Sequence, residues 1–180
     1  MRLVETSSTT LGTTSWIWGG FTVDIYKGRI LREHEDLDYL TLNLHTLKSQ
    51  FAELFEHIGW QVQHLDNGDL KLRKDGLKIQ LGHVEFSDKV TWTHNGERGH
   101  IYFPVKWLRQ EVVQFYDIEL HVAEPEFQYV LKEYPEMLNP EWVLREKDIV
   151  AKQQLREILE RRGIDVDGLG SQVSDWIGVN

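Results

Sequence analysis

Two aspartates one residue apart, Asp36 and Asp38, are the side chains in this chain best suited to metal chemistry. They follow the charged residues 32–35, and the sequence around them predicts an extended strand. Side chains alternate between the two faces of a strand, so we expect both carboxylates to point the same way. Adjacent carboxylates repel each other, and a divalent cation between them removes that repulsion. The alternative is a strand end with two solvated aspartates, which is the commoner meaning of Asp-x-Asp.

A pair of glycines, Gly19 and Gly20, separates a short apolar run at residues 16–18 from a predicted helix. Glycine lets the backbone approach a phosphate closely, and the start of a helix offers free N–H groups to it. Four side chains of the predicted helix are available for burial: Phe21, Val23, Ile25 and Tyr26. The glycine pair therefore indicates a turn that can bind phosphate.

The whole run of residues 16–39 resembles the nucleotidyltransferase superfamily, in which Gly-Gly, a helix and Asp-x-Asp on the next strand follow one another. It is most similar to the lincosamide and aminoglycoside (2''-type) nucleotidyltransferases. The pattern Arg-x-His-x-Asp-x-Asp of that branch is filled here by Arg32, His34, Asp36 and Asp38. The resemblance covers residues 16–159, densely at the start and weakly later.

This resemblance implies transfer of AMP, or another nucleoside monophosphate, from a nucleoside triphosphate such as ATP to a hydroxyl of a small molecule. An aminoglycoside- or lincosamide-like compound is the implied acceptor. Asp36 and Asp38 would be catalytic and would hold Mg²⁺ against the triphosphate. The residues implied in nucleotide binding are Gly19, Gly20, Arg32, His34, Lys132 and Lys147. Without the resemblance, a surface ion pair explains Arg32 equally well, and a solvated helix surface explains each lysine better.

The resemblance also implies a third carboxylate on a later strand, and Gln80 occupies that position. Glutamine forms hydrogen bonds but cannot act as a general base and is a poor Mg²⁺ ligand. The apolar alternation slips by one residue after Leu81, which predicts a β-bulge at Gly82. Such a bulge would turn Glu85 towards the aspartates as a substitute catalytic carboxylate. His83 is an alternative base, although a half-exposed strand histidine is its simpler interpretation.

Composition predicts one ordinary globular domain over residues 1–180. The chain is 41% hydrophobic and 27% charged, with a net charge of −9. An acidic surface argues against binding nucleic acid, which needs clustered Lys and Arg, and suits a cationic substrate. The sequence contains no cysteine, which excludes disulfide and thiolate chemistry and fits a reducing cytoplasm. No signal peptide or membrane-spanning run is visible, so we expect no membrane partner.

Hydropathy patterning predicts an α+β fold: a nucleotidyltransferase-like mixed β-sheet of five or six strands with flanking helices and a C-terminal helical pair. Residues 1–15 are expected to form a flexible start or an edge strand, and residues 164–180 a tail. A core-packing helix is expected over residues 43–58, ended by Gly59.

Turn and cap signals complete the predicted arrangement. Hairpin turns are expected at Asp75-Gly76 and Asn95-Gly96. Pro125 is expected to open the first C-terminal helix. The pair Asn139-Pro140 is expected to cap the second helix, which would include Trp142.

Three functions are consistent with these residues. The first is Mg²⁺-dependent nucleotidyl transfer to a small molecule. The second, favoured by Gln80, is a catalytically impaired nucleotide-binding or regulatory protein of the same fold. The third is a nucleotidyltransferase acting on a protein or tRNA, and the net charge of −9 argues against tRNA. Mg²⁺-dependent nucleotide binding and pyrophosphate release distinguish these functions.

Overall fold

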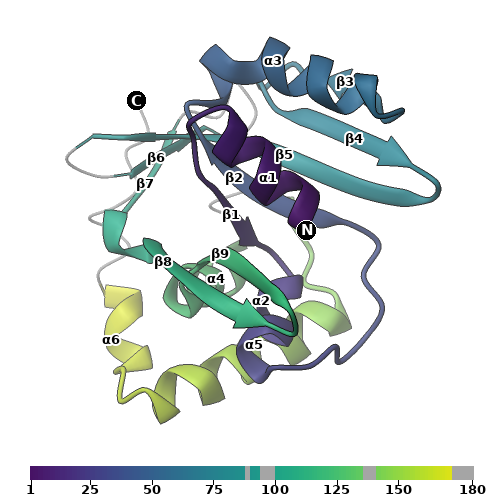
Figure 1. Cartoon of the computed structure of the whole chain (residues 1–180). Coiled ribbons are helices and arrows are strands. Elements are labelled where there is room, and N and C mark those ends of the chain that lie inside the picture. The colour runs from purple at the N-terminus through teal and green to yellow at the C-terminus, as the bar shows by residue number, and fades with distance from the viewer. Residues whose placement is uncertain (88–89, 94–99, 136–140, 172–180) are drawn as a thin grey trace.

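The computed structural model describes residues 1–87, 90–93, 100–135 and 141–171 of the 180-residue chain. Its strands are β1 (Ser15–Trp18), β2 (Leu37–Leu42), β3 (Gln61–His64), β4 (Leu70–Lys74), β5 (Leu77–Phe86), β6 (Val90–Thr93), β7 (His100–Phe103), β8 (Leu108–Phe115) and β9 (Ile118–Ala123). Its helices are α1 (Arg2–Thr10), α2 (Phe21–Lys27), α3 (Leu44–His57), α4 (Pro125–Glu133), α5 (Glu146–Arg161) and α6 (Val166–Ser171), with a 3₁₀ turn η1 (Val105–Trp107). The chain therefore has the predicted α+β composition (Figure 1).

Within the described residues, nine strands form one mixed sheet in the order β3-β4-β5-β2-β1-β9-β8, with β6 and β7 continuing from β5. The predicted sheet of five or six strands was too small. One reason is that residues 108–123 form two strands, β8 and β9. Tyr116, at φ 52°, turns the chain between these two strands. The central strand β2 is antiparallel to β1 and parallel to β5.

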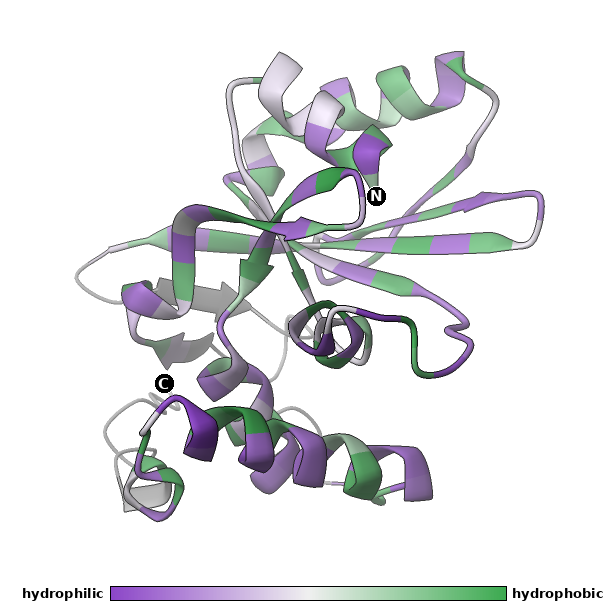
Figure 2. Cartoon of the chain, turned by 60° about the horizontal axis from the view of Figure 1, so that its bottom comes forward, coloured by the Kyte–Doolittle hydropathy of each residue, from purple (hydrophilic) through white to green (hydrophobic). Residues whose placement is uncertain are grey.

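Helices lie on both sides of the sheet, and the long strands show alternating hydropathy (Figure 2). We call the side covered by α4 and α5 the α4 face, and the side covered by α1 and α3 the α3 face. Trp16, Leu40 and Val84 pack on the α4 face with helix residues such as Phe127 and Leu155. The next strand residues, Ile17, Tyr39 and Leu81, pack on the α3 face with Val4, Phe51 and Phe55. Strand alternation therefore decides which chemistry each face can carry.

The N-terminal helix α1 corrects the expectation of a flexible start. Serine and threonine favour helices weakly, but packing against the sheet overrides that preference here. Val4 is fully buried in the core. The buried Ser8 hydroxyl lies 2.7 Å from that of Ser15, which lies 2.8 Å from Thr41 Oγ1. A chain of hydroxyl contacts thus ties α1 to β1 and β2.

The predicted bulge at Gly82 is wrong. β5 pairs in unbroken register with β2, from Leu37 opposite Ile79 to Leu42 opposite Val84. Ile79 and Leu81 are buried on the α3 face, whereas Val84 is buried on the α4 face. The apparent slip therefore marks the place where the buried side of a regular strand changes from the α3 face to the α4 face.

Several local predictions are confirmed. α3 covers nearly all of the predicted residues 43–58, and Gly59 follows it at φ 82°. Asp75 and Gly76 both have positive φ, as a tight hairpin turn between β4 and β5 requires. β6 and β7 pair as an antiparallel hairpin, while the turn predicted at Asn95-Gly96 lies outside the described residues.

The C-terminal part begins with α4 at Pro125, as predicted. α5 begins at Glu146, later than expected, so Trp142 precedes it. The predicted cap at Asn139-Pro140 lies outside the described residues, and α6 occupies part of the predicted tail. In the part of the chain that is described, no helix is both long and apolar enough to cross a membrane.

Candidate active site

A cavity of about 260 Å³ opens where β1 ends and β2 begins, and α4 and α5 close its other side. Seven of the predicted site residues line it: Gly19, Gly20, Arg32, Asp36, Asp38, Lys132 and Lys147. Three predicted residues, His34, Gln80 and Glu85, are not among its lining residues. The cavity thus collects residues that are more than 100 positions apart in the sequence.

The two aspartates are the strongest electrostatic feature of this cavity. Asp36 is exposed directly before β2, and Asp38 is partly buried in the strand. Burial, followed by the negative charges of Asp36 and Asp69, raises the pKa of Asp38 to about 7, and Lys132 and Lys71 oppose this rise. A carboxylate in this setting gains stability from a nearby cation. The pair therefore fits a divalent metal ion, and oxygen ligands of this kind suit Mg²⁺.

The backbone at Gly19 makes room for this carboxylate. Gly19 has φ 80°, a conformation that favours glycine, and a Cβ there would lie 2.7 Å from Asp38 Oδ2. A Cβ on Gly20 would collide with the Arg32 guanidinium. Gly19 is therefore required by its backbone conformation and by close packing, whereas the exposed end of the Arg32 side chain can move away from a Cβ at Gly20.

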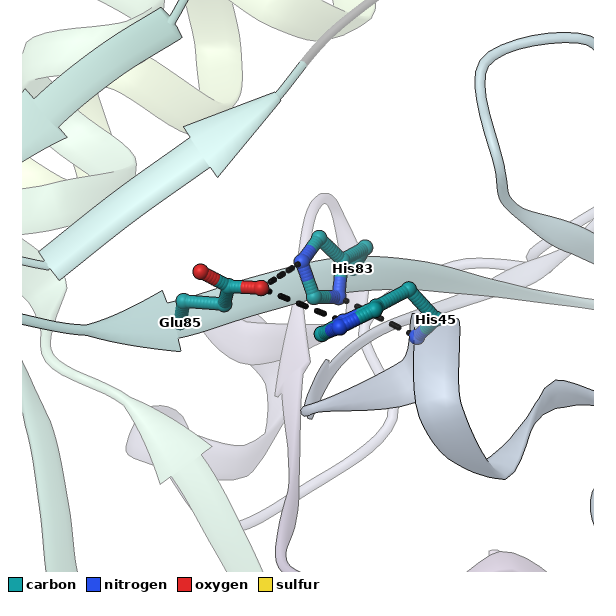
Figure 3. Close-up of side chains that lie close together, drawn as sticks. All are labelled: His45, His83 and Glu85. Carbon is teal, nitrogen blue, oxygen red and sulfur yellow. Dashed lines mark hydrogen bonds and ion pairs between the residues drawn. The ribbon is translucent and has the colours of Figure 1, made fainter.

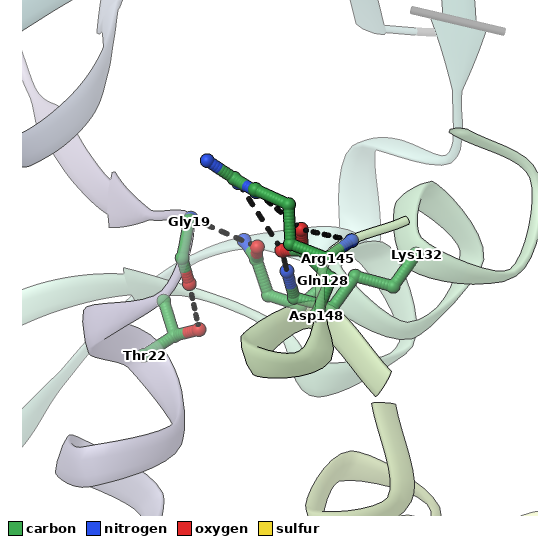
Figure 4. Close-up of polar contacts among 6 residues, drawn as sticks. All are labelled: Gly19, Thr22, Gln128, Lys132, Arg145 and Asp148. Atoms are coloured by element: carbon green, nitrogen blue, oxygen red, sulfur yellow. Dashed lines mark hydrogen bonds and ion pairs between the residues drawn. The ribbon is translucent and has the colours of Figure 1, made fainter. Parts of the chain in front are cut away.

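The Gly19 turn is also fixed by hydrogen bonds (Figure 4). Its N–H donates to Gln128 Oε1 at 2.8 Å, and its carbonyl accepts from the Thr22 hydroxyl at 2.7 Å. The Gly19 N–H is thus already engaged by the protein. Gln128 is 2% exposed, and its Nε2 finds no hydrogen-bond partner among the described residues. Because Gln128 lines the cavity, this unsatisfied donor is suited to an oxygen of a bound ligand.

Three charged side chains join α4 to α5 beside the cavity (Figure 4). Asp148 accepts from Lys132 Nζ at 2.9 Å and from Arg145 Nε at 2.7 Å. Burial raises the pKa of Asp148, but these hydrogen bonds outweigh it and lower the pKa to about 2. The network holds two cationic side chains at the cavity wall opposite the aspartates.

His34 stabilises the loop before β2. Its Nε2 lies 3.0 Å from Oδ2 of the buried Asp24, which also accepts from the Leu31 N–H at 2.9 Å. The ring packs edge-on against Phe21 with centroids 4.8 Å apart. His34 thus fastens residues 28–36 to α2, rather than lining the cavity as a phosphate contact.

Gln80 lies opposite Asp38 in the β2–β5 register, so it stands beside the aspartates on the α4 face. Its Nε2 donates to Asp69 Oδ2 at 2.9 Å. Asp69 is 3% exposed and also accepts from Asn67 Nδ2 and the His83 N–H. A buried carboxylate therefore sits next to the position where the resembling enzymes were expected to have one.

Glu85 points away from the aspartates, which corrects the expected substitution. Without a bulge, it shares the α3 face with Leu81 and His83, on the opposite side from Gln80. Its Oε1 lies 3.2 Å from His83 Nε2 and 3.1 Å from His45 Nδ1. Neither Glu85 nor His83 is in a position to act on a group bound between Asp36 and Asp38.

Sequence reasoning missed Gln128, Asp69 and Arg145 as members or neighbours of the site. Gln128 lies on a helix that also carries Glu126, Lys132 and Glu133, so its polarity alone does not single it out in the sequence. Asp69 follows Asn67 in a turn, where aspartate is common because its side chain can hydrogen-bond to the nearby backbone. Arg145 lies three residues before Asp148, and the two form a capping box at the start of α5.

Residues 1–129 match the aminoglycoside-2''-adenylyltransferase family. No protein of curated function matches the sequence. Among solved structures, the lincosamide antibiotic adenylyltransferase LnuA with lincomycin bound is 20% identical, with a TM-score of 0.67 over 87% of this chain and 94% of that one. ANT(2'')-Ia in complex with adenylyl-2''-tobramycin is 17% identical, with a TM-score of 0.68 over 94% of this chain and 92% of that one. An antigenic nucleotidyltransferase-like protein from Paracoccidioides brasiliensis is 14% identical, with a TM-score of 0.52 over 97% and 90% of the two chains. The predicted nucleotidyltransferase-like fold is confirmed.

The variant Asp148→Asn tests the network between α4 and α5. The folded-state pKa of about 2 lies below the ordinary 3.8, so the carboxylate's contribution is present above about pH 4 and is lost as pH falls through about 2. The shift corresponds to roughly 2 kcal/mol. In urea titrations, the wild type should exceed Asp148→Asn in unfolding free energy near pH 6, and the difference should shrink towards pH 2.

The matched control is Asp117→Asn, which removes a carboxylate from an exposed ion pair with Arg2. Exposed pairs contribute little to stability. The difference in unfolding free energy between wild type and Asp117→Asn should therefore stay small across the same pH range. An Asp148→Asn deficit that does not change with pH would contradict the charge network.

Proposed function

Because the chain belongs to the aminoglycoside-2''-adenylyltransferase family, we propose that it transfers AMP, or another nucleoside monophosphate, to a hydroxyl of a small-molecule acceptor. A nucleoside triphosphate, with ATP as the first candidate, would be the donor. The observation that carries the proposal is the single cavity in which Asp36 and Asp38 face Lys132 and the glycine turn. It combines a place for a divalent cation with cationic groups for phosphate.

Asp36 and Asp38 would hold Mg²⁺ in this proposal. The raised pKa of Asp38 supports it, because Lys132 and Lys71 compensate the charge of this carboxylate only in part in the free protein. When bound, the metal would stabilise negative charge on the phosphoryl oxygens and on the departing pyrophosphate. Because Gly19 has no side chain, the Asp38 carboxylate can pack against the backbone there. This contact helps to fix the position of the carboxylate oxygens that would bind the metal.

The remaining cavity residues would position the triphosphate. Lys132 is held by Asp148, so it loses little rotamer freedom on contacting a phosphate. Arg32 and Lys147 line the same space and add positive charge. The unsatisfied Gln128 Nε2 would donate to a phosphate oxygen, which would satisfy a buried donor that the free protein leaves unpaired.

A second cavity, of about 720 Å³, suits the acceptor. It shares Arg32, Glu35 and Asp36 with the first cavity, so the two meet at an aspartate that would hold the metal. Its other walls include the apolar side chains of Phe21, Trp60 and Leu77 and the carboxylate of Glu33. An acceptor with some apolar surface would match this lining, which carries both acidic and basic side chains, and the net charge of −9 of the whole chain favours a cationic acceptor.

A second candidate function is nucleotide binding with impaired catalysis. It is favoured by one observation: Gln80, which cannot remove a proton, stands beside Asp38 where a third carboxylate was expected. Glu85 lies on the other face and does not replace it. The proposed transferase would then depend on Asp36 and the metal to activate the acceptor hydroxyl, and its turnover would be slow.

The proposal is tested by incubating the protein with ATP, Mg²⁺ and panels of lincosamides and aminoglycosides. Pyrophosphate release and a mass gain of one AMP on the acceptor are the readouts. Asp36→Asn with Asp38→Asn keeps the side-chain shapes but removes both charges, so turnover should fall by roughly 10²-fold or more. The exposed pair Asp66→Asn with Asp75→Asn should leave turnover unchanged. If the first double variant binds Mg·ATP as tightly as wild type in calorimetry, the metal site is elsewhere.

An exchange of Asp69 and Gln80 separates the two candidate functions. Asp69→Asn with Gln80→Asp moves the carboxylate next to Asp38, while one amide and one carboxylate still face each other. We expect this exchange to raise turnover on the order of 10²-fold, the scale of a gained general base. Gln80→Asp alone would place a second carboxylate against that of the buried Asp69. The repulsion between them should destabilise the protein.

Asp69→Asn alone is the control and should not raise turnover. If the exchanged variant is no faster than wild type, the Gln80 position takes no part in proton removal. If only the exchanged variant transfers AMP, wild type is the impaired nucleotide-binding protein.

A further inference from the structure

Three side chains with metal-binding atoms converge on the α3 face, away from the candidate active site (Figure 3). His45 lies in the first turn of α3, and His83 and Glu85 lie two residues apart on β5, so their side chains share one face. Glu85 Oε1 is 3.1 Å from His45 Nδ1 and 3.2 Å from His83 Nε2. All three ligand atoms lie within 4.8 Å of one another.

We propose that His45, His83 and Glu85 bind a divalent transition-metal ion, for which Zn²⁺ is the best match. Two imidazoles and one carboxylate form a ligand set that Zn²⁺ favours, whereas Mg²⁺ and Ca²⁺ prefer oxygen ligands. Tetrahedral zinc bonds of about 2.0–2.2 Å place neighbouring ligand atoms about 3.3 Å apart. Both nitrogen-to-oxygen separations already match this spacing. The fourth position is open to water.

The framework around these side chains is already assembled. The Asn43 N–H donates to the Val84 carbonyl at 2.9 Å, which fastens the start of α3 to β5. The two imidazole rings meet edge-on with centroids 4.7 Å apart. The His83 side chain is 13% exposed, whereas those of His45 and Glu85 are 52% and 48% exposed. An ion can therefore reach the site from solvent without unfolding of the core.

Metal binding competes with hydrogen bonds in the free protein. Glu85 Oε1 accepts from both rings when each facing nitrogen carries its proton. A bound ion requires the lone pairs of these nitrogens, so each proton moves to the other ring nitrogen. For His83 that nitrogen, Nδ1, lies 3.4 Å from the His45 N–H, and this long contact would be lost. We therefore expect micromolar binding rather than the tight binding of an all-cysteine site.

A bound ion would cross-link the helix α3 and the strand β5, both of which are connected to the candidate active site. α3 follows directly on β2, which carries Asp38, and β5 carries Gln80. An ion held by His45 from α3 and His83 from β5 would join these elements from the opposite face of the sheet. Binding to the folded state alone raises thermal stability with ion concentration.

Calorimetric titration of Zn²⁺ into Asp36→Asn with Asp38→Asn, without nucleotide, tests the site. This background removes the carboxylate pair that would otherwise bind the ion, and it is independent of catalytic activity. We expect one Zn²⁺ per chain and a rise in melting temperature that Mg²⁺ does not reproduce. Adding His45→Ala or Glu85→Gln should weaken Zn²⁺ binding on the order of 100-fold or more, since even outer-shell partners contribute 10- to 100-fold.

His57→Ala is the matched control, because His57 is an exposed histidine on the same helix. It should leave the affinity and the melting shift unchanged. His45 is half exposed and alanine favours helices, so circular dichroism should show a folded variant. The proposal is overturned if the background binds no Zn²⁺, which leaves a hydrogen-bonded triad only. It is equally overturned if His45→Ala and Glu85→Gln bind Zn²⁺ as the background does.

Discussion

The partial burial of the Asp38 carboxylate beside Asp36 is the constraint on which the rest of the candidate site depends. A negative charge held partly away from water and beside a second carboxylate is unfavourable, and the pKa of about 7 for Asp38 reflects this. The protein offsets the charge only in part, through Lys132 and Lys71. The unfavourable charge is the reason for proposing a cation at this site.

The neighbouring elements either make room for that carboxylate or position the charged residues around it. Gly19 leaves space that a side chain would fill, and Gln128 fixes the glycine turn through a single hydrogen bond. The buried pair of Asp24 and His34 fastens the loop that delivers Asp36. Across the cavity, Asp148 holds Lys132 in place. The site is therefore rigid where the metal is proposed and cationic where phosphate is proposed.

The sequence was most informative where the site is local. The glycine pair, the following helix and the two aspartates lie within residues 16–39, and their relation is fixed by short-range geometry. Lys132 and Lys147 could be placed only through the family resemblance, because their position depends on how α4 and α5 pack. Both nevertheless line the cavity that contains Asp36 and Asp38.

Predictions failed where tertiary packing decides the outcome. The weak helix formers of α1 become helical because Val4 is buried against the sheet. Gly82 needed no bulge, because the buried side of the regular strand β5 changes between Leu81 and Val84, and Glu85 consequently faces His83 and His45. Neither the burial of β5 on two faces nor the contact between Asp69 and Gln80 has a signature in a single sequence.

The most direct test of the central claim is a crystal structure of the protein with a non-hydrolysable ATP analogue and Mn²⁺ in place of Mg²⁺. Anomalous scattering locates Mn²⁺ independently of the surrounding density. The account predicts an anomalous peak bound by the carboxylates of Asp36 and Asp38 and by the triphosphate, with the phosphates beside Lys132. Nucleotide bound in another cavity, or a nucleotide-associated Mn²⁺ peak that neither aspartate contacts, would contradict it.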